Sequence, residues 1–386
     1  MTIKEFAYSA QQQLEARAGV KFKRAHVYEL LAASFGYSSF AALCAESVVF
    51  LGRQASKQGS QHNLDLRRRC AEFGYPSATV DIVLAEFPAF IAETRATFIT
   101  FSALVAQLRR QLSSVYGYPD WGDADDFVDD EDEDHFEDIV DSDWPLFDEE
   151  YEGSHFPPDL LTGLENAAVK DHADAHYALA LIYMPSDGED REIGSEFWYT
   201  QKQRGRVLTG AEKEWADQYA RTIANQKKYE LHLREAGRLG NEQALLDLAE
   251  RFEDVSFFEN VKSGSNVDPV RAAEIAQNLG RMNDVYDWLT IGARAGNVEA
   301  MRRLIEEFDH DNLLQCWTWF HLAKLLGTDL ARDNYYGINE DGSLYDDDVG
   351  GPVYAAGRGG IRLVALSEGQ DVLARQQAQA LFEKIQ

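Results

Sequence analysis

Cysteine, proline and long apolar runs are all scarce in this sequence of 386 residues, which has three cysteines and nine prolines. Because Cys44, Cys70 and Cys316 stand singly, the sequence excludes a disulfide-stapled scaffold and a clustered zinc site. It has no run of eighteen apolar residues, so no transmembrane helix is expected, and its first thirty residues lack the apolar core of a signal peptide. These absences predict a soluble, cytoplasmic protein.

Basic residues are also few: the sequence has 37 Lys and Arg against 66 Asp and Glu, which gives a net charge of −29. This balance opposes nonspecific binding of the whole chain to nucleic acid or anionic membranes. The charge is uneven. Residues 1–118 hold 13 basic and 9 acidic residues, whereas residues 119–152 hold 18 acidic residues and no Lys or Arg. The shifts in charge indicate separate parts along the chain.

Three windows in the region after residue 153 superpose without gaps: Ala167–Tyr183, Ala236–Phe252 and Gly292–Phe308. Each begins with a small residue and has alanine at the ninth position, leucine at the thirteenth and an aromatic residue at the seventeenth. The alanine and leucine lie four residues apart and so share one helical face, where the alanine lets a neighbouring helix approach closely. The windows therefore predict packed helices.

The fifth position of each window predicts a turn between two helices. It is Gly240 or Gly296 in the second and third windows, where glycine can take positive φ and end a helix. Asn241 or Asn297 then follows as a cap for the next helix. Asp171 occupies the fifth position of the first window.

These windows resemble the Sel-one-like repeat family, a relative of the tetratricopeptide repeats, whose pattern is roughly A-A-x-x-G-x-x-x-A-x-x-x-L-x-x-x-Y. The resemblance covers about residues 160–330. It departs from the family at Asp171, and its fifth positions lie 69 and 56 residues apart, whereas family units have about forty residues. The resemblance implies a right-handed α-solenoid that serves as a protein-interaction scaffold, and it implies no reaction.

We therefore predict an all-α protein in four parts. Residues 1–118 form a mildly basic helical module, and residues 119–152 an acidic–aromatic connector. Residues 153–330 form the repeat solenoid, and residues 331–386 an acidic loop or hairpin followed by a capping helix from Ser367 to Ile385. The hairpin or loop insertion is expected near 334–353, around the turn dipeptide Asp341-Gly342.

The N-terminal module is predicted to begin with helical hairpins. Val27, Leu30, Leu31 and Phe35 have the spacing of one amphipathic helix, and a second helix is expected from Ser38 or Ser39 through Val48. The phrase Phe-Gly-Tyr recurs 38 residues later, and a long helix is expected over about 79–112, with Pro88 as a candidate kink.

Basic residues give the N-terminal module a second interpretation, as a binder of nucleic acid or an anionic surface. The candidate contacts are Lys21, Lys23, Arg24, Arg67, Arg68 and Arg69. A helix-turn-helix DNA reader is disfavoured, since the segment SSFAALCAES in the recognition position has no Arg, Lys, Asn or Gln for bidentate base contacts. An exposed basic face on a packed module is the simpler interpretation.

The connector interleaves carboxylates with aromatic side chains, a composition that can fold onto a basic, grooved partner. Its candidate contact residues are Trp121, Phe127, Phe136, Trp144 and Phe147. A solvated linker, docking onto the chain's own N-terminal module and docking onto a separate partner all remain open.

No catalytic motif stands out: the sequence has no phosphate-binding loop, dinucleotide fingerprint or nucleophile elbow. His172 and His176 have the spacing of two zinc ligands on a helix, but they fall inside the first window and are interpreted as structural. We predict no enzyme activity, metal or cofactor. The expected function is a bacterial scaffold or adaptor that binds a protein partner, in a signalling, stress or phage-defence system. The alternative is a sensor of nucleic acid or anionic surfaces through the basic module, masked by the connector.

Overall fold

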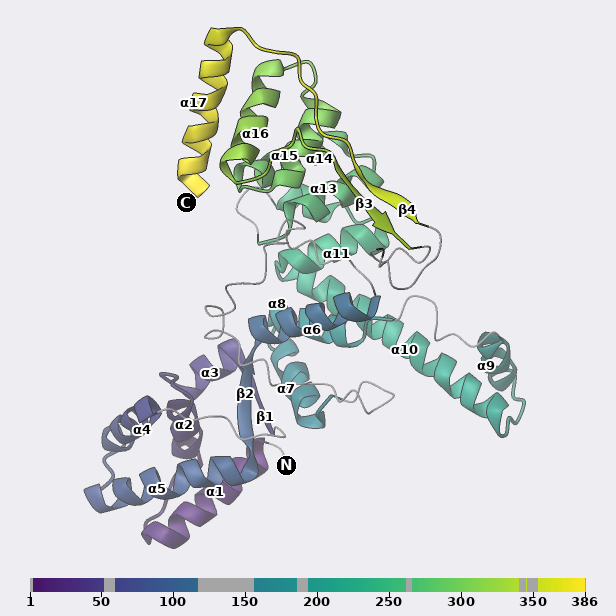
Figure 1. Ribbon diagram of the computed structural model, residues 1–386. Helices are drawn as coiled ribbons and strands as arrows, with labels where there is room; N and C mark the ends of the chain where they lie inside the picture. Colours follow the sequence, from purple (N-terminus) through teal and green to yellow (C-terminus); the bar gives the residue numbers. More distant parts are fainter. Residues whose placement is uncertain are drawn as a thin grey trace. The chain divides into compact units, whose positions relative to one another are not determined.

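The computed structural model describes residues 3–51, 60–116, 156–185, 194–261, 266–339, 345 and 353–385 (Figure 1). These residues fold mostly into helices, as the sequence predicts, and they include two antiparallel sheets of two strands each. They fall into two compact units, and the division between them lies at Leu245 and Leu246. The four predicted parts remain a prediction.

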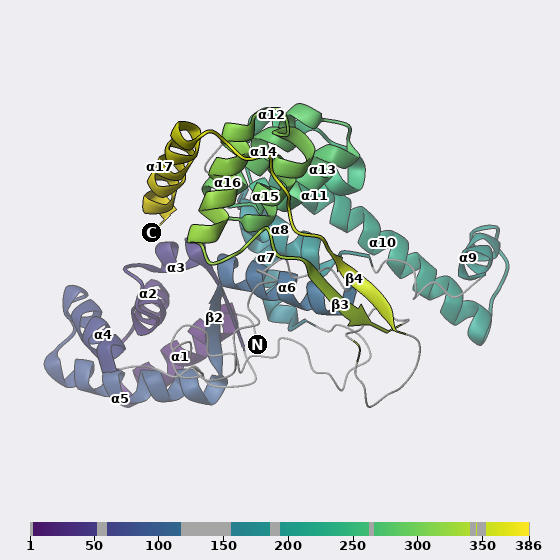
Figure 2. The same cartoon turned by 45° about the horizontal axis from the view of Figure 1, so that its top comes forward.

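The first unit begins with a module of short helices and one two-stranded sheet. Its elements are α1 (Ile3–Ala18), α2 (Arg24–Ser34), α3 (Phe40–Glu46), β1 (Ser47–Leu51), α4 (Ser60–Glu72), α5 (Ser77–Thr94), β2 (Ala96–Thr100) and α6 (Phe101–Tyr116). Helices α1 and α5 lie side by side, and α2 packs against α4 (Figure 2). The residues predicted to share one face of α2 are all buried, which confirms that amphipathic helix.

The repeated Phe-Gly-Tyr phrase forms the same turn twice. Gly36 and Gly74 both have positive φ, at 82° and 74°. The amide of Tyr37 donates to the carbonyl of Ala32, and that of Tyr75 donates to the carbonyl of Cys70. These are the closing bonds of a Schellman motif, so the recurring phrase ends a helix in both places.

The helix expected from Ser39 through Val48 is too long. Helix α3 ends at Glu46, and Val48 lies in β1, opposite Ile99 of β2. The strand residues Ser47–Leu51 are mostly β-branched or aromatic, which suits a pleated surface. Their partner lies some fifty residues away, so helical spacing in the local sequence could not reveal the pairing.

The long helix expected over 79–112 is also wrong. Pro88 lies inside α5, which continues to Thr94, and the chain then turns at Arg95, where φ is 55°. Strand β2 follows, and α6 begins at Phe101. Pairing with β1 explains the break, because one continuous helix would leave the edge of β1 without a partner.

Four further helices complete most of the first unit. They are α7 (Pro158–Ala168), α8 (Ala173–Ile182), α9 (Ser195–Gln203) and α10 (Ala211–Arg238). Helix α8 packs against α6, α7 and α10, while α9 lies against the other end of α10 (Figure 1). Gly163 of α7 is essential to close packing on the sheet, because a Cβ there would overlap Cγ1 of Val48.

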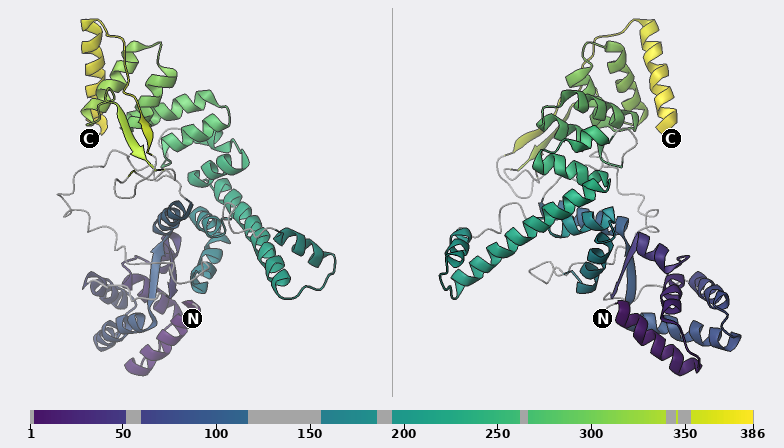
Figure 3. Two further views of the ribbon diagram at one scale, coloured as in Figure 1. Left: turned by 45° about the vertical axis from the view of Figure 1, so that its right-hand side comes forward. Right: turned by 180° about the vertical axis from the view of Figure 1, so that it is seen from behind.

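Helix α11 (Glu242–Phe252) contains the division, and the second unit continues as a series of helices with a small sheet. Its elements are α12 (Ser256–Asn260), α13 (Pro269–Asn278), α14 (Met282–Arg294), α15 (Val298–Arg303), the π-helical turn η1 (Leu304–Phe308), α16 (Leu313–Leu325), β3 (Asn334–Ile338), β4 (Tyr354–Arg358) and α17 (Glu368–Ile385). Helix α17 confirms the predicted C-terminal helix and lies along α16 (Figure 3).

The predicted hairpin insertion is longer than its turn dipeptide suggests. Strand β3 pairs with β4, and Ile338 lies opposite Tyr354. A tight turn at Asp341-Gly342 would instead have placed the second strand next to the dipeptide, near Tyr345. The dipeptide itself lies outside the described residues.

Candidate interaction surfaces

The three repeat windows share one turn geometry. Asp171, Gly240 and Gly296, at the fifth position of each window, have φ values of 58°, 92° and 98°. In each case the amide of the next residue donates to the carbonyl of the window's first residue, at 3.3, 3.0 and 2.9 Å. The first window therefore has the same turn as the others, although its sequence has aspartate where the pattern has glycine.

The residue after each turn caps the following helix. The side chain of Asn241 accepts from the amide of Ala244, and that of Asn297 accepts from the amide of Ala300, both at 2.8 Å. In the first window Nδ1 of His172 takes this role, accepting from the amide of Ala175 at 3.4 Å. The ninth-position alanines Ala175, Ala244 and Ala300 are fully buried, and the thirteenth-position leucines Leu179, Leu248 and Leu304 are nearly so.

His172 also ties the first window to the N-terminal module. Its Nε2 donates to the carbonyl of Ala45, at the end of α3, over 2.7 Å. Both ring nitrogens are therefore in use, since Nε2 carries the proton and Nδ1 accepts. The ring of Phe101 lies 4.1 Å from that of His172. The structural interpretation of His172 has a specific basis in these contacts.

His176 pairs with a residue that sequence spacing did not single out. Its Nδ1 lies 3.0 Å from Nδ1 of His232 on α10, and its Nε2 donates to the carbonyl of Ala168 over 3.1 Å. With its proton on Nε2, His176 accepts at Nδ1, so His232 must donate from its own Nδ1. His172 and His176 thus bond to different partners and do not face one common ligand.

His232 is held in its neutral form. Burial is the main cause that lowers its pKa to about 4, and the nearby His176 and Lys228 lower it further. The ring of Tyr183 is stacked on His232 at a centroid distance of 6.1 Å, and the Lys228 ammonium lies 4.3 Å from the centre of the Tyr183 ring. The junction between α8 and α10 is therefore an aromatic and histidine cluster beside one cation.

The predicted basic residues of the N-terminal module separate into two groups. Lys21, Lys23 and Arg24 are exposed at the start of α2, with the Arg24 guanidinium 5.2 Å from the centre of the Tyr8 ring. The second group pairs with carboxylates of the same module. Its pairs are Arg67 with Asp81, Arg68 with Asp65 and Glu72, and Arg69 with Glu29 and Glu72.

The predicted aromatic contacts of the connector lie outside the described residues. They are Trp121, Phe127, Phe136, Trp144 and Phe147.

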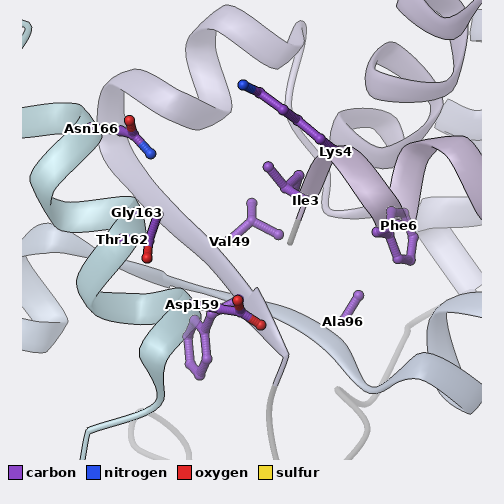
Figure 4. A pocket seen from close by; sticks show the side chains of 10 residues that line it. Ile3, Lys4, Phe6, Val49, Ala96, Asp159, Thr162, Gly163 and Asn166 are labelled. Atoms are coloured by element: carbon purple, nitrogen blue, oxygen red, sulfur yellow. The ribbon is translucent and has the colours of Figure 1, made fainter. Parts of the chain in front are cut away.

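A small cavity lies where the module meets α7, between α1, β1, β2 and α7 (Figure 4). Its volume is about 160 Å³, and Phe6, Val49 and Ala96 are among its apolar lining residues. Lys4 and Asn166 lie at one end and Asp159 at the other (Figure 4). A cavity of this size holds a few water molecules or a small solute.

The second unit contains a buried carboxylate that no sequence pattern singles out. Asp309 is 7% exposed and follows the π-helical turn η1. Its Oδ2 accepts from the indole N–H of Trp319 at 3.0 Å, and its Oδ1 accepts from the hydroxyl of Tyr286 at 3.5 Å. The thiol of Cys316 donates to its backbone carbonyl at 3.0 Å. Burial raises the pKa of Asp309 and, as the largest cause, raises that of Cys316 to about 11.

The β3–β4 ribbon presents aromatic side chains to solvent. Tyr335 is 63% exposed, and Tyr336 and Tyr354 are each 48% exposed. Residues directly opposite in the register share a face, so Tyr336 lies beside Ala356 and near Tyr354. Tyr335 and Tyr336 are consecutive in β3, so their side chains lie on opposite faces of the ribbon. Both faces therefore carry exposed aromatic surface.

No family model, curated protein or solved structure matches this chain. None of the helices in the described ranges is both long enough and apolar enough to cross a membrane. Within those same ranges, no three His, Cys, Asp or Glu side chains gather where they could bind a metal ion.

Proposed function

We propose that this chain is a non-enzymatic protein-interaction scaffold, in which the helix–turn–helix windows between about residues 153 and 330 stack as Sel-one-like repeats in an α-solenoid. The supporting observation is the shared turn of the three windows, above all the one at Asp171. A unit of two helices cannot bury its apolar face alone, so repeats of this kind gain their core by stacking on neighbours. Stacked repeats present extended surfaces that suit a protein partner.

We further propose that the scaffold works in the cytoplasm of a bacterium, in signalling, stress or phage defence. Support for the compartment comes from the cysteines, because Cys44, Cys70 and Cys316 are all free thiols. Cytoplasmic proteins keep their thiols reduced, whereas secreted proteins of this size commonly pair them.

Exposed apolar side chains on the repeat helices are the positions from which a partner can be trapped. Val169 is 86% exposed in the first unit. Met282 and Leu325 are 49% and 41% exposed in the second. We expect a photo-crosslinking amino acid at these positions, introduced one at a time in the native cell, to trap the same protein from several of them.

The matched control places the same amino acid at Leu64 of α4, which is 60% exposed but lies outside the repeats. The trapped protein must then bind the purified full-length chain saturably in isothermal titration calorimetry. The proposal fails if the repeat positions trap nothing beyond what Leu64 traps, or if the trapped protein does not bind once purified.

A second candidate function is the sensing of nucleic acid or anionic surfaces by the N-terminal module. Lys21, Lys23 and Arg24 favour it, because all three are exposed within about one helical turn. The pairing of Arg67, Arg68 and Arg69 with carboxylates weakens it. Fluorescence anisotropy with labelled duplex DNA and RNA, at about 50 and 200 mM salt, tests this function. Salt-sensitive binding that Lys23→Glu abolishes would support it, and no binding at low salt would remove it.

A further inference from the structure

The segment from α9 through α10 has a small excess of basic residues, in contrast to the chain as a whole. Residues 194–238 contain nine Lys or Arg and six Asp or Glu, although the whole chain carries a net charge of −29. Helix α10 is also the longest helix among the described residues, at 28 residues. It holds α9 at one end and packs on α8 near the other (Figures 1 and 3).

One side of α10 faces its neighbours and the opposite side faces solvent. Tyr229 and Leu233 are buried, whereas Leu231, two residues from each, is 58% exposed. Residues at helical spacing from Leu231 form what we call the cationic face of α10. Its members are Lys213, Asp217, Ala220, Arg221, Ala224, Lys227 and Leu231, and its one carboxylate, Asp217, pairs with Lys202 of α9. These positions span about 27 Å of helix.

The cations of this face are available to a partner. Lys213, Arg221 and Lys227 are exposed, and among the described residues no carboxylate lies within 4.0 Å of their charged atoms. The hydrogen bond from Lys202 lowers the pKa of Asp217, and Lys213 and Arg221, which flank Asp217, help to lower it. Other cations of residues 194–238 are paired, among them Lys202 with Asp217 and Arg206 with Glu212. Ala220 and Ala224 have short side chains, so the helix surface between the cations is recessed. Leu231 adds an exposed apolar side chain to this face.

We propose that the cationic face of α10 is the docking surface for the chain's own acidic segment, residues 119–152. The charges are complementary, because that segment carries 18 Asp or Glu and no Lys or Arg. It also carries six aromatic side chains, which can cover Leu231 and the alanines while carboxylates meet the cations. The proposal goes beyond the scaffold function and does not depend on it.

The length of the segment allows this contact. The chain between Tyr116, the end of α6, and Phe156, just before α7, has 39 residues, which can extend to about 130 Å. Helices α6 and α7 both pack against α8, which packs against α10 in the same unit. Because both ends of the segment are held, its middle can reach about half of that length, which still exceeds the length of about 42 Å of α10.

The structure favours α10 over the N-terminal module as the docking surface. Arg67, Arg68 and Arg69 already pair with carboxylates of the module. The other predicted contact residues there, Lys21, Lys23 and Arg24, lie within four consecutive positions. They can meet few carboxylates at once, whereas the cationic face of α10 extends over about five helical turns.

Zero-length crosslinking of the full chain tests the proposal. A carbodiimide joins a lysine amine to a carboxylate only when the two are in contact, and mass spectrometry identifies the joined residues. We expect links from Lys213 and Lys227 to carboxylates of residues 119–152. An equal mixture of 15N-labelled and unlabelled protein should give links within one isotope only. Raising the salt from about 0.05 to 0.5 M should lower their yield severalfold.

Arg221→Glu and Arg24→Glu form the matched pair of variants, since both lysine reporters remain and the net charge changes equally. Arg221→Glu should lower the Lys227 links about two- to fivefold, the range for losing one exposed ion pair, while Arg24→Glu leaves them unchanged. Circular dichroism confirms that both variants are folded. Links to Lys21 or Lys23 in place of α10, links between differently labelled chains, or no links from α10 would each overturn the proposal.

Discussion

Asp171 and Gly240 occupy the same position in two helix–turn–helix windows, and both take the left-handed backbone conformation, with φ of 58° and 92°. Glycine reaches this conformation without strain, whereas most other residues pay about 1–2 kcal/mol. Aspartate is one of the residues that visit it most readily. The carboxylate of Asp171 also meets Arg238 at 3.2 Å. The packing of the two helices thus requires a left-handed residue at this turn, and both glycine and aspartate can adopt that conformation.

We expect Gly240→Ala to lower the free energy of unfolding by about 1–2 kcal/mol, even though a Cβ at Gly240 meets no atom within 4 Å. Gly240→Asp should cost less than Gly240→Ala. Urea unfolding followed by circular dichroism measures both. Gly369→Ala is the control, because Gly369 has open space and lies in the first turn of α17. Equal effects at Gly240 and Gly369 would contradict the role given to φ.

Gly163→Ala should destabilise the first unit by about 1–3 kcal/mol, because the added Cβ overlaps Cγ1 of Val48 on β1. Val48→Ala alone should also destabilise, since Val48 is 4% exposed and its methyl groups fill the contact. The double variant should be more stable than the sum of the two losses. A double-mutant cycle of unfolding free energies measures this coupling. Strict additivity would show that α7 does not pack on β1 at this point.

Asp309→Ala should lower the free energy of unfolding by about 1–3 kcal/mol, because the indole N–H of Trp319 then has no acceptor in a buried site. Asp309→Asn keeps an acceptor and removes the charge. Burial raises the pKa of Asp309 in the folded protein, so the folded state holds this proton more tightly than the unfolded chain. Stability should therefore fall as the pH rises from about 4 through the folded-state pKa.

The side-chain amide that Asp309→Asn introduces does not titrate, so this part of the pH dependence should vanish in that variant. Thermal unfolding between about pH 4 and 7.5, followed by tryptophan fluorescence, compares the wild type with Asp309→Asn. A pH profile that is identical for the two proteins would argue against a buried, titrating carboxylate.

His232 should make the first unit sensitive to acid in the opposite direction. Its folded-state pKa is lowered to about 4, chiefly by burial, so the unfolded chain binds the proton more tightly. Stability should be fully present above about pH 6.5 and should fall as the pH drops toward 4. The loss is at most about 3 kcal/mol, and the partial exposure of the ring reduces it. His232→Asn should flatten this profile.

The matched control for His232 is His310→Asn, because the side chain of His310 is 64% exposed and lies beside Asp311. This variant should keep the wild-type profile. Urea unfolding midpoints at about pH 7.5, 6.5, 5.5 and 4.5 measure how stability depends on pH in each protein. If the midpoints of His232→Asn fall with decreasing pH as steeply as those of the wild type, His232 is not the group responsible.

The sequence by itself determined the helical character of the chain, several of the helix ends and the three repeat windows. It did so because these depend on local physics. Val27, Leu30 and Leu31 have helical spacing within one turn or two, Gly36 and Gly296 end helices through their own φ, and Asn297 caps from one residue away. The first window departs from the pattern at Asp171, and the structure shows that it nevertheless has the same turn as the other two.

Only the tertiary structure decided the features that join distant parts of the chain. Strand β1 exists because residues 47–51 meet residues 96–100, a pairing between segments about fifty residues apart that no local pattern reveals. His176 meets His232 across 56 residues, and Trp319 turns its N–H to Asp309 because a π-helical turn places that carboxylate inside the core. Long-range contacts override local propensity since packing free energy is collective, whereas propensity acts one residue at a time.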